Sequence, residues 1–526
     1  MKTSNIKSTH INRVIRTFIG GLLIAVIASC SDFLTIYPTD SVVLENYWKE
    51  KNDVEAMVSN CYRSMSQLNF LEKFIVWGEI RSDNVIGGPT INESGNTGLR
   101  DINEANLYST NGYCSWADYY NVINNCNIVL KFAPEVMELD PDYTEGDYKV
   151  HKGEMLAIRA LCHFCLLRTF RDIPLLTEAM IDDSQNLYQE QVSPQAALDC
   201  ILTDLFEAEN LVMKSGNYIK DAENRGRMTR DAVRAMIADA LLWKAAFAQY
   251  EAPTDTATYV QYYTQCTEYC DMVIDERMDY LNRHKDELGL NMETMKYPLM
   301  ENFSTGNITY NGSPAYDEIF GGTMNSQIES IFEIQVSGKD IVEQNYIIPK
   351  IYGRGLVSTA PFCASSYLSG ENESDLYPET DIRRVTFMDV LDAEDSDCPI
   401  AKYSASTHIG IFSKSSKNLT PEYRTSYYQA DDKLAYHKMY YIRGCNWIVY
   451  RISDVMLMKA EALAHRADIE AGDLDKAFEM VSNEPKCLIA AVRNITPSIR
   501  QLRLYHHLQY TFRQFNTPNF ILSSTS

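Results

Sequence analysis

Residues 229–242 read TRDAVRAMIADALL, and the apolar side chains among them recur every three or four positions. This is the period of an amphipathic α-helix, and Thr229 is a residue type that caps the start of one. The apolar face of this predicted helix consists of Val233, Met236, Ile237, Ala240 and Leu241. The pattern therefore predicts a helical core in this part of the chain.

The same period recurs on both sides of this segment, as far back as residue 52 and as far on as about residue 280. Ser193 followed by Pro194 marks one helix start. The backbone N–H at the first position of a helix makes no hydrogen bond within the helix, so proline, which has no N–H, is tolerated there. The other predicted helices run from Asn52 or Asp53 to about Leu68, from Ser115 past Leu130, from about Asp147 to Thr169 and from about Thr256 to Ile274. Helices of similar length in consecutive pairs are typical of helical-repeat proteins.

From about residue 280 to residue 450 the helical period fades, and Gly, Asn, Ser and Tyr become more frequent. Residues 329–336 place Phe332, Ile334 and Val336 on one face, which predicts a short strand among long loops. A helix returns at residues 453–465, where apolar residues cover nearly the whole circumference, so it should be buried. The fold class is thus mainly α, with helix pairs packed against a loop-rich region that holds a few short strands.

The N-terminus has the pattern of a secretory signal. Four basic residues precede an apolar run from Phe18 to Ala28, which is shorter than the roughly 20 residues that span a bilayer. The run ends in small residues before Cys30, as in the bacterial lipobox, whose cysteine is lipidated and becomes the mature N-terminus. Lipidation of Cys30 would anchor the protein to a membrane without spanning it. The alternative is an ordinary buried cysteine after an apolar stretch.

The composition excludes some classes of function. The chain has 526 residues, 71 acidic and 48 basic, with a net charge of −23. A chain this acidic repels phosphate backbones, so nucleic acid is not an expected partner. No later segment has the 18 or so consecutive apolar residues of a membrane span. The sequence lacks H-E-x-x-H, G-x-S-x-G and P-loop motifs, so we expect no enzyme.

Several short motifs resemble, in their order along the chain, the SusD/RagB family of nutrient-binding outer-membrane lipoproteins. Each motif is weak alone, but their succession from Cys30 to about residue 480 is specific. The motifs are residues 32–34 (DFL), 37–40 (YPTD), 47–49 (YWK), 78–83 (GEIRSD), 119–127 (YYNVINNCN), 153–161 (GEMLAIRAL), 170–175 (FRDIPL), 227–229 (RMT) and 450–462 (YRISDVMLMKAEA).

The resemblance implies a SusD-like fold with tetratricopeptide-like helix pairs. It also implies a lipoprotein on the cell surface that captures a glycan and delivers it to a SusC-like TonB-dependent transporter, acting as a lid over that barrel. A helical-repeat scaffold that binds a protein or peptide at the cell surface is the alternative function.

The C-terminus departs from the family pattern. Residues 481–526 carry five basic residues and one acid, and they show neither a family motif nor a clean amphipathic stripe. We interpret this tail as a frameshifted or aberrant end, with a genuine divergent tail as the alternative. The expected organisation is a signal peptide (residues 1–29), a helical region (30–280), a loop-rich region with a returning helix (281–480) and this tail (481–526).

A glycan site needs an aromatic ring against the apolar face of a sugar and planar polar groups beside it. Such residues should lie in loops, which selects Asp83, Asn84, Tyr108, Tyr113 and Tyr316 as candidates. Each could instead serve turn chemistry or be half-buried. By contrast, Asn127, Arg159 and His163 lie on predicted buried helix faces, where structural hydrogen bonds and pairing are favoured over ligand contact.

Two patterns resemble metal sites weakly. Cys162 and Cys165 have C-x-x-C spacing but lie in an apolar helical run without a second pair, so core filling is the favoured reading. The acidic run Asp392, Glu394, Asp395 and Asp397 could hold calcium, but it lacks the glycine and terminal glutamate of an EF-hand loop. We therefore expect no cofactor, with structural calcium as the alternative for this run.

Overall fold

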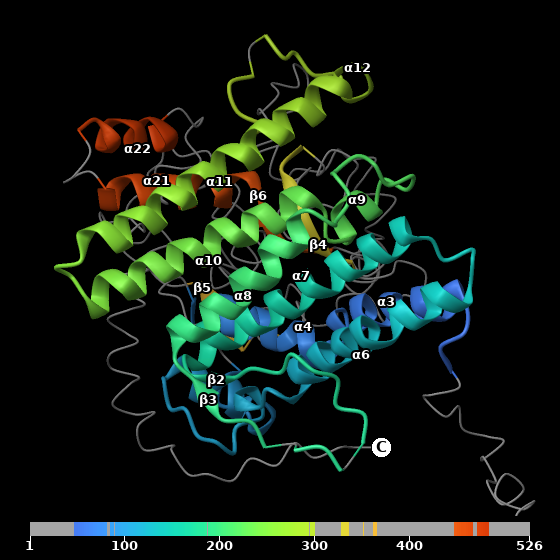
Figure 1. The fold of residues 1–526 in the computed structure, drawn as a ribbon. Coiled ribbons are helices and arrows are strands. Elements are labelled where there is room, and N and C mark those ends of the chain that lie inside the picture. Colours follow the sequence, from blue (N-terminus) through green and yellow to red (C-terminus); the bar gives the residue numbers. More distant parts are fainter. Residues whose placement is uncertain are drawn as a thin grey trace, which may run out of the picture.

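The computed structural model describes residues 47–80, 85–88, 90–182, 184–186, 188–293, 295–299, 328–335, 351, 361–364, 446–466 and 471–482. Within these ranges the protein is mostly helical, as the sequence predicts (Figure 1). The longer helices are α3 (Lys51–Met65), α4 (Leu68–Ile75), α6 (Ala117–Leu139), α7 (Glu145–Phe170), α8 (Pro194–Glu209), α10 (Arg230–Glu251), α11 (Thr256–Arg283), α21 (Ile452–Arg466) and α22 (Asp473–Ser482). The shorter helical segments are η1 (Val76–Ile80), η2 (Ser94–Asn96), α5 (Thr97–Asn103), η3 (Gly112–Cys114), α9 (Glu223–Gly226) and α12 (Lys285–Leu288).

Local capping explains where these helices begin. Helix α8 starts at Pro194 with the Ser193 side chain accepting a hydrogen bond from the Ala196 N–H, which confirms the predicted start. Thr229 precedes the first residue of α10, also as predicted. The predicted cap of α3 was wrong: Glu50 occupies that position, and Asp53 lies three residues inside the helix as its partner in a capping box. Helix α11 continues nine residues beyond the predicted end at Ile274, to Arg283.

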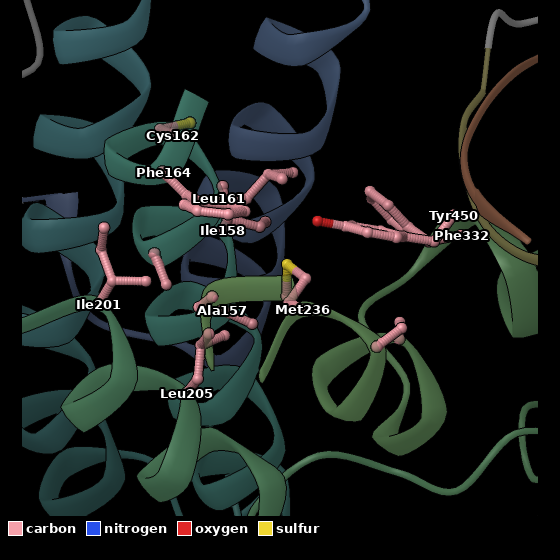
Figure 2. Packing of buried hydrophobic residues seen from close by; sticks show 14 of the residues in the cluster. Ala157, Ile158, Leu161, Cys162, Phe164, Ile201, Leu205, Met236, Phe332 and Tyr450 are labelled. Atoms are coloured by element: carbon pink, nitrogen blue, oxygen red, sulfur yellow. The ribbon is translucent and has the colours of Figure 1, made fainter. Parts of the chain in front are cut away.

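Helices α3, α6, α7, α8, α10 and α11 form what we call the helix stack. Each of them packs against the next one in the sequence, and α21 packs against α11 (Figure 1). Figure 2 shows the core at the level of α7, where Ile158 and Leu161 approach Ile201 of α8 and Met236 of α10. The apolar face predicted for residues 233–241 is buried. The tetratricopeptide-like succession of helix pairs is therefore present.

Three two-stranded antiparallel ribbons accompany the helices, and two of them join distant segments. Strand β1 (Val85–Gly87) pairs with β5 (Phe362–Ala364), and β4 (Ser330–Ile334) pairs with β6 (Trp447–Arg451). The third ribbon, β2 (Ile173–Pro174) with β3 (Gln191–Val192), follows α7. The short strand predicted within 329–336 is confirmed as β4, and all five of its residues are buried.

Buried ion pairs connect the elements of the core. The Arg159 guanidinium of α7 donates to both carboxylate oxygens of Asp204 in α8, at 2.8 and 2.7 Å. Arg277 of α11 pairs with Asp231 of α10 at 3.0 Å and donates to the Ser330 carbonyl of β4 at 2.8 Å. These contacts fix how neighbouring helices sit against each other, because a buried charge requires its partner.

The residues predicted to be structural rather than ligand-binding are buried. The Asn127 amide donates to the carbonyls of Leu176 and Glu178, both at 3.0 Å. His163 is fully buried and accepts from the Leu176 N–H through Nε2. Cys162 is also fully buried, which fits core filling.

Other predictions fall outside the described ranges. No helix within those ranges has a long enough apolar stretch to cross a bilayer. The signal segment and the acidic run at 392–397 are not described, and of the tail at 481–526 only the end of α22 is. Helix α21 and strand β6 share the hydrophobic core of the helix stack.

Candidate functional site

The candidate site that the structure describes is the segment between β1 and α6, here called the 90–116 loop. It contains two of the predicted glycan-binding residues, Tyr108 and Tyr113. It also contains the short helical segments η2, α5 and η3. The other predicted site residues, Cys30, Asp83, Asn84 and Tyr316, lie outside the described residues. The structure therefore places two of the five predicted glycan-binding side chains.

Asn111 braces the 90–116 loop from within. Its side-chain oxygen accepts from the Tyr113 N–H at 3.0 Å, and its amide donates to the Gly98 carbonyl at 2.9 Å. A second amide, that of Asn96, donates to the Thr90 carbonyl at 2.9 Å. These bonds tie the start of α5 to Thr90 on one side and to Asn111 on the other, so the backbone of the loop has a defined shape in the absence of ligand.

Tyr113 faces inward. Its hydroxyl donates to the carboxylate of Glu72 in α4, and its carbonyl accepts from the Trp77 indole N–H at 2.8 Å. Its ring lies so close to Gly98 that a Cβ on that glycine would be 3.2 Å from it. Burial first, and the Glu72 charge second, raise the pKa of the Tyr113 hydroxyl far above its ordinary value, so it remains a donor. The structure gives Tyr113 a role in anchoring the loop to α4.

An aromatic layer lies beneath the loop. The Trp77 ring stacks on Tyr119 with 4.7 Å between ring centroids and meets the edge of Phe170 at 5.3 Å. Trp116 also contacts Phe170, with 5.4 Å between ring centroids. Contacts of this kind between aromatic rings favour edge-on and offset geometries and hold the rings rigidly. The loop therefore rests on a firm base at the junction of η1, α6 and the end of α7.

Tyr108 faces outward. Its side chain is 57% exposed, whereas the preceding residue, Leu107, is 8% exposed and belongs to the core. The Tyr108 carbonyl accepts from the Asn111 N–H at 2.9 Å, so the same residue that braces the loop also holds this backbone. The 90–116 loop thus presents one aromatic ring to solvent from a fixed position. A ring held in this way can cover the apolar face of a sugar without first being ordered.

Three residues that shape this site are not among the predicted glycan-binding residues: Glu72, Trp77 and Asn111. Glu72 and Trp77 belong to α4 and η1, and their bonds to the loop span about forty positions of sequence. Asn111 had a local signal, since Asn next to Gly favours turns and side-chain-to-backbone bonds. Among the described residues, no group of three or more His, Cys, Asp or Glu could hold a metal ion.

Comparison with known proteins identifies relatives for the N-terminal part. Residues 33–266 match a SusD-like family model described as "Starch-binding associating with outer membrane". A SusD-like protein of Formosa agariphila is 29% identical over 205 residues, which is 38% of this chain and 38% of that protein. A second one from the same bacterium is 24% identical over 218 residues, again 38% of each. The match thus spans less than half the length of either relative.

Solved structures extend the likeness to most of the fold. A SusD homologue from Bacteroides thetaiotaomicron has a TM-score of 0.56 at 18% identity and covers 88% of this chain and 84% of that one. A laminarin-binding SusD-like protein has a TM-score of 0.51, also at 18% identity, over 82% of this chain and 84% of that one. At such identities the likeness is one of fold. The chain thus matches a SusD-like family model over residues 33–266 and is similar in fold to SusD-like proteins over most of its length.

Proposed function

We propose that this protein is a glycan-binding lipoprotein of the outer-membrane surface, anchored by acyl chains on Cys30. It captures a glycan and delivers it to a SusC-like TonB-dependent transporter, over which it acts as a lid. The description of the matched family, which names starch binding and association with the outer membrane, supports the binding role and the location. A relative in fold that is named for laminarin binding supports a glycan as the ligand class.

The observation that carries the proposal is the exposed Tyr108 ring on the braced 90–116 loop. An aromatic face of this kind contributes about 0.5–1.5 kcal/mol when a flat apolar surface stacks on it. Asp83 and Asn84, just before β1, supply the carboxylate and amide for sugar hydroxyls, and Tyr316 supplies a second ring. Tyr113 supports the loop from below, through Glu72.

The protein binds without catalysis in this proposal. Its sequence carries none of the nucleophile, zinc-protease or nucleotide-binding motifs that we sought. A hydrolase would release new reducing ends from the glycan that it retains, so binding and hydrolysis can be read in the same assay.

The test uses the mature chain with Cys30→Ala, which keeps the protein in solution. We would run it through native gels that contain starch, laminarin or other polysaccharides, and assay each mixture for released reducing ends. Retardation by one glycan without released ends is the expected result. Retardation with released ends would overturn the non-enzyme part, and no retardation by any glycan would overturn glycan binding.

A matched pair of variants locates the site. Tyr108→Ala should weaken glycan affinity about three- to tenfold, which corresponds to one lost stacking contact. Tyr188→Ala is the control, because Tyr188 is similarly exposed, at 54%, but lies between β2 and β3. Equal effects of the two variants would contradict a site on the 90–116 loop.

Delivery to a transporter is tested separately. Outer membranes from cells that make the lipidated protein would be solubilised in mild detergent, and the protein recovered by an affinity tag. A large TonB-dependent barrel should co-purify in a constant ratio. Its absence would leave glycan binding standing and overturn the lid and delivery role.

A scaffold that binds a protein or peptide remains the second candidate, because the helix stack is built from consecutive helix pairs. The two functions predict different binding results for the folded protein. A scaffold would not be retarded by any glycan and would retain a protein partner instead.

A further inference from the structure

The turn that ends helix α7 contains a strained residue. Arg171 follows the last residue of the helix with a φ of 68° and a ψ of −73°. The Asp172 N–H donates to the Phe170 carbonyl at 3.0 Å, which closes a three-residue γ-turn around Arg171. This form of the γ-turn, with positive φ, is rare because it strains any residue that has a side chain. Among the described residues, Arg171 is the only one larger than alanine with a positive φ.

The core on both sides of the turn holds this conformation in place. The Phe170 ring contacts both tryptophans of the aromatic layer beneath the 90–116 loop. On the other side, Ile173 of β2 is fully buried. Because both neighbours are fixed, the turn between them is imposed on Arg171 and Asp172. The strained residue therefore stands beside the base of the 90–116 loop.

The Arg171 side chain gives the fold little stability in return. Its Nη1 donates to Oδ2 of Asp172 at 2.8 Å, but the two side chains are 32% and 40% exposed, and ion pairs in such positions contribute little. Its Nε is buried and has no hydrogen-bond partner among the described residues, which is a further cost. Strain and an unsatisfied donor in a partly exposed residue are typical of binding sites, where function offsets them.

We propose that Arg171 and Asp172 form a polar subsite for the glycan beside the base of the 90–116 loop, and that this glycan is a neutral one. The inference rests on the proposed function. The ion pair uses Nη1 and Oδ2, which leaves Nη2 to donate and Oδ1 to accept. A sugar hydroxyl can both donate and accept, so two adjacent hydroxyls fit the two free ends of the pair.

Charge selects the class of glycan. The carboxylate of Asp172 offsets the positive charge of Arg171, so the pair offers no net charge to attract an anion. A carboxylate or sulfate on the glycan would meet Asp172 at this subsite, on a chain whose net charge is −23. Uncharged hydroxyls meet no such repulsion. The subsite therefore suits a neutral polysaccharide rather than a uronate or sulfated one.

The main test is Arg171→Gly in the mature chain with Cys30→Ala. Glycine adopts a positive φ without strain, so the melting temperature should rise by about 2 °C. The affinity for the retained glycan, measured from retardation at increasing polysaccharide concentration, should fall about tenfold. Unchanged affinity would overturn the proposal. A fall in both affinity and melting temperature would also overturn it, because Arg171 would then act by supporting the fold.

A conservative variant and a distant control sharpen this result. Arg171→Lys keeps the charge but loses the planar fork, so affinity should fall about threefold. Arg283→Ala is the control, since Arg283 is an exposed arginine at the end of α11, near α12, which lies far from β2 in Figure 1. It should leave affinity unchanged. An equal loss in Arg283→Ala and Arg171→Gly would assign the effect to total charge and overturn the proposal.

The choice of polysaccharides separates this inference from the function on which it rests. Starch and laminarin are neutral glucans, whereas alginate is a polymer of uronates. Retardation by a neutral glycan and none by alginate is the expected result. Retardation by alginate alone would leave glycan binding standing and overturn the neutral subsite. No retardation by any glycan would overturn the proposed function and this inference with it.

Discussion

The helix stack and the 90–116 loop are both well-defined parts of this molecule, but different interactions hold them. In the helix stack, apolar faces that recur every turn are buried against the neighbouring helix, and buried ion pairs such as Arg159–Asp204 join one helix to another. In the 90–116 loop, a few polar side chains bond to backbone groups, as Asn111 does with Gly98 and Tyr113.

This difference teaches where each region is sensitive to change. A helix in the stack is supported by many small contacts and depends strongly on any buried charge that it carries. The loop depends on a few hydrogen bonds, each worth only about 1 kcal/mol. Its exposed ring can change without affecting the fold, and this separation of support from contact is what a binding site requires.

The largest loss of stability is expected in the helix stack, for Arg159→Ala. This change removes four hydrogen bonds and leaves the Asp204 carboxylate buried without its cation. Breaking a buried pair in this way costs about 3–5 kcal/mol, to be measured by urea unfolding. Lys149→Ala, which removes an exposed ion pair with Glu145, is the control and should leave the unfolding free energy unchanged. A similar loss in both variants would contradict the argument.

Acid should weaken the stack through His163. Burial, and secondly the nearby Arg159 charge, lower the pKa of His163 from 6.5 to about 3. Below pH 6.5 the unfolded chain binds a proton at this position and the folded chain does not, so stability falls as the pH falls. Between pH 7 and pH 5 this amounts to about 2 kcal/mol.

The control for this prediction is His163→Gln, which keeps an acceptor for the Leu176 N–H and does not titrate. The unfolding free energies of the two proteins would be measured in urea across this pH range. The carboxylates contribute equally to both proteins, so their contribution cancels in the difference. As the pH falls from 7 to 5, that difference should shrink by about 2 kcal/mol. Parallel curves would show that His163 does not couple protonation to folding.

A close contact within the stack gives a third prediction. A Cβ added at Gly153 in α7 would lie 2.8 Å from Cβ of Leu211 and 2.9 Å from Cγ1 of Val212. Gly153→Ala should therefore cost about 1–2 kcal/mol by overpacking, in spite of the better helix propensity of alanine. Gly146→Ala, in the same helix, would meet only Thr144 Oγ1 at 3.6 Å and should stabilise slightly. The melting temperatures of the two variants would be compared with that of the unsubstituted protein. A shift in the same direction for both variants would contradict the prediction.

In the 90–116 loop, Tyr113→Phe tests the anchor to α4. The change deletes the hydroxyl that donates to Glu72 and keeps the ring against Gly98. We expect a loss of about 1 kcal/mol in unfolding free energy, together with weaker glycan binding if the anchor positions Tyr108. Tyr188→Phe removes the hydroxyl of an exposed tyrosine and is the matched control. Unchanged stability of Tyr113→Phe would refute the anchoring role.

The smallest effect on stability is expected for Tyr108→Ala. The ring is largely exposed, so the unfolding free energy should change by less than about 0.5 kcal/mol. A urea titration on the sample used for the glycan gels would check this. A substantial loss of stability would mean that Tyr108 supports the loop, and that its effect on glycan binding is indirect.

The sequence predicts the helix stack well because its signals are local. Ser193 caps α8 within three residues of itself, Thr229 stands at the residue before α10, and the apolar period is visible in any window of two turns. The predicted burial of Asn127, Arg159 and His163 is confirmed for the same reason. The partner of Arg159 could not be predicted, because Asp204 lies on another helix, and which carboxylate faces the guanidinium depends on how the two helices pack.

The site is harder to predict, because its geometry rests on contacts between segments without a shared pattern. Tyr108 and Tyr113 lie in one loop and look alike in sequence, but one faces solvent and the other faces Glu72. Only the three-dimensional position of α4 distinguishes them. The N-cap of α3 was also predicted wrongly. Glu50 occupies that position and forms a capping box together with Asp53.

The pairing of distant strands imposes an order on folding. Each helix of the stack finds its partner in the next segment of the chain, so these contacts form quickly, whereas β4 is completed only when β6, more than a hundred residues later, has arrived. Arg277 holds the start of β4 against α11 in the meantime, through the Ser330 carbonyl. Until β6 arrives, one edge of β4 can accept a strand from a neighbouring molecule, so the interval between the two strands is when this chain is most exposed to aggregation.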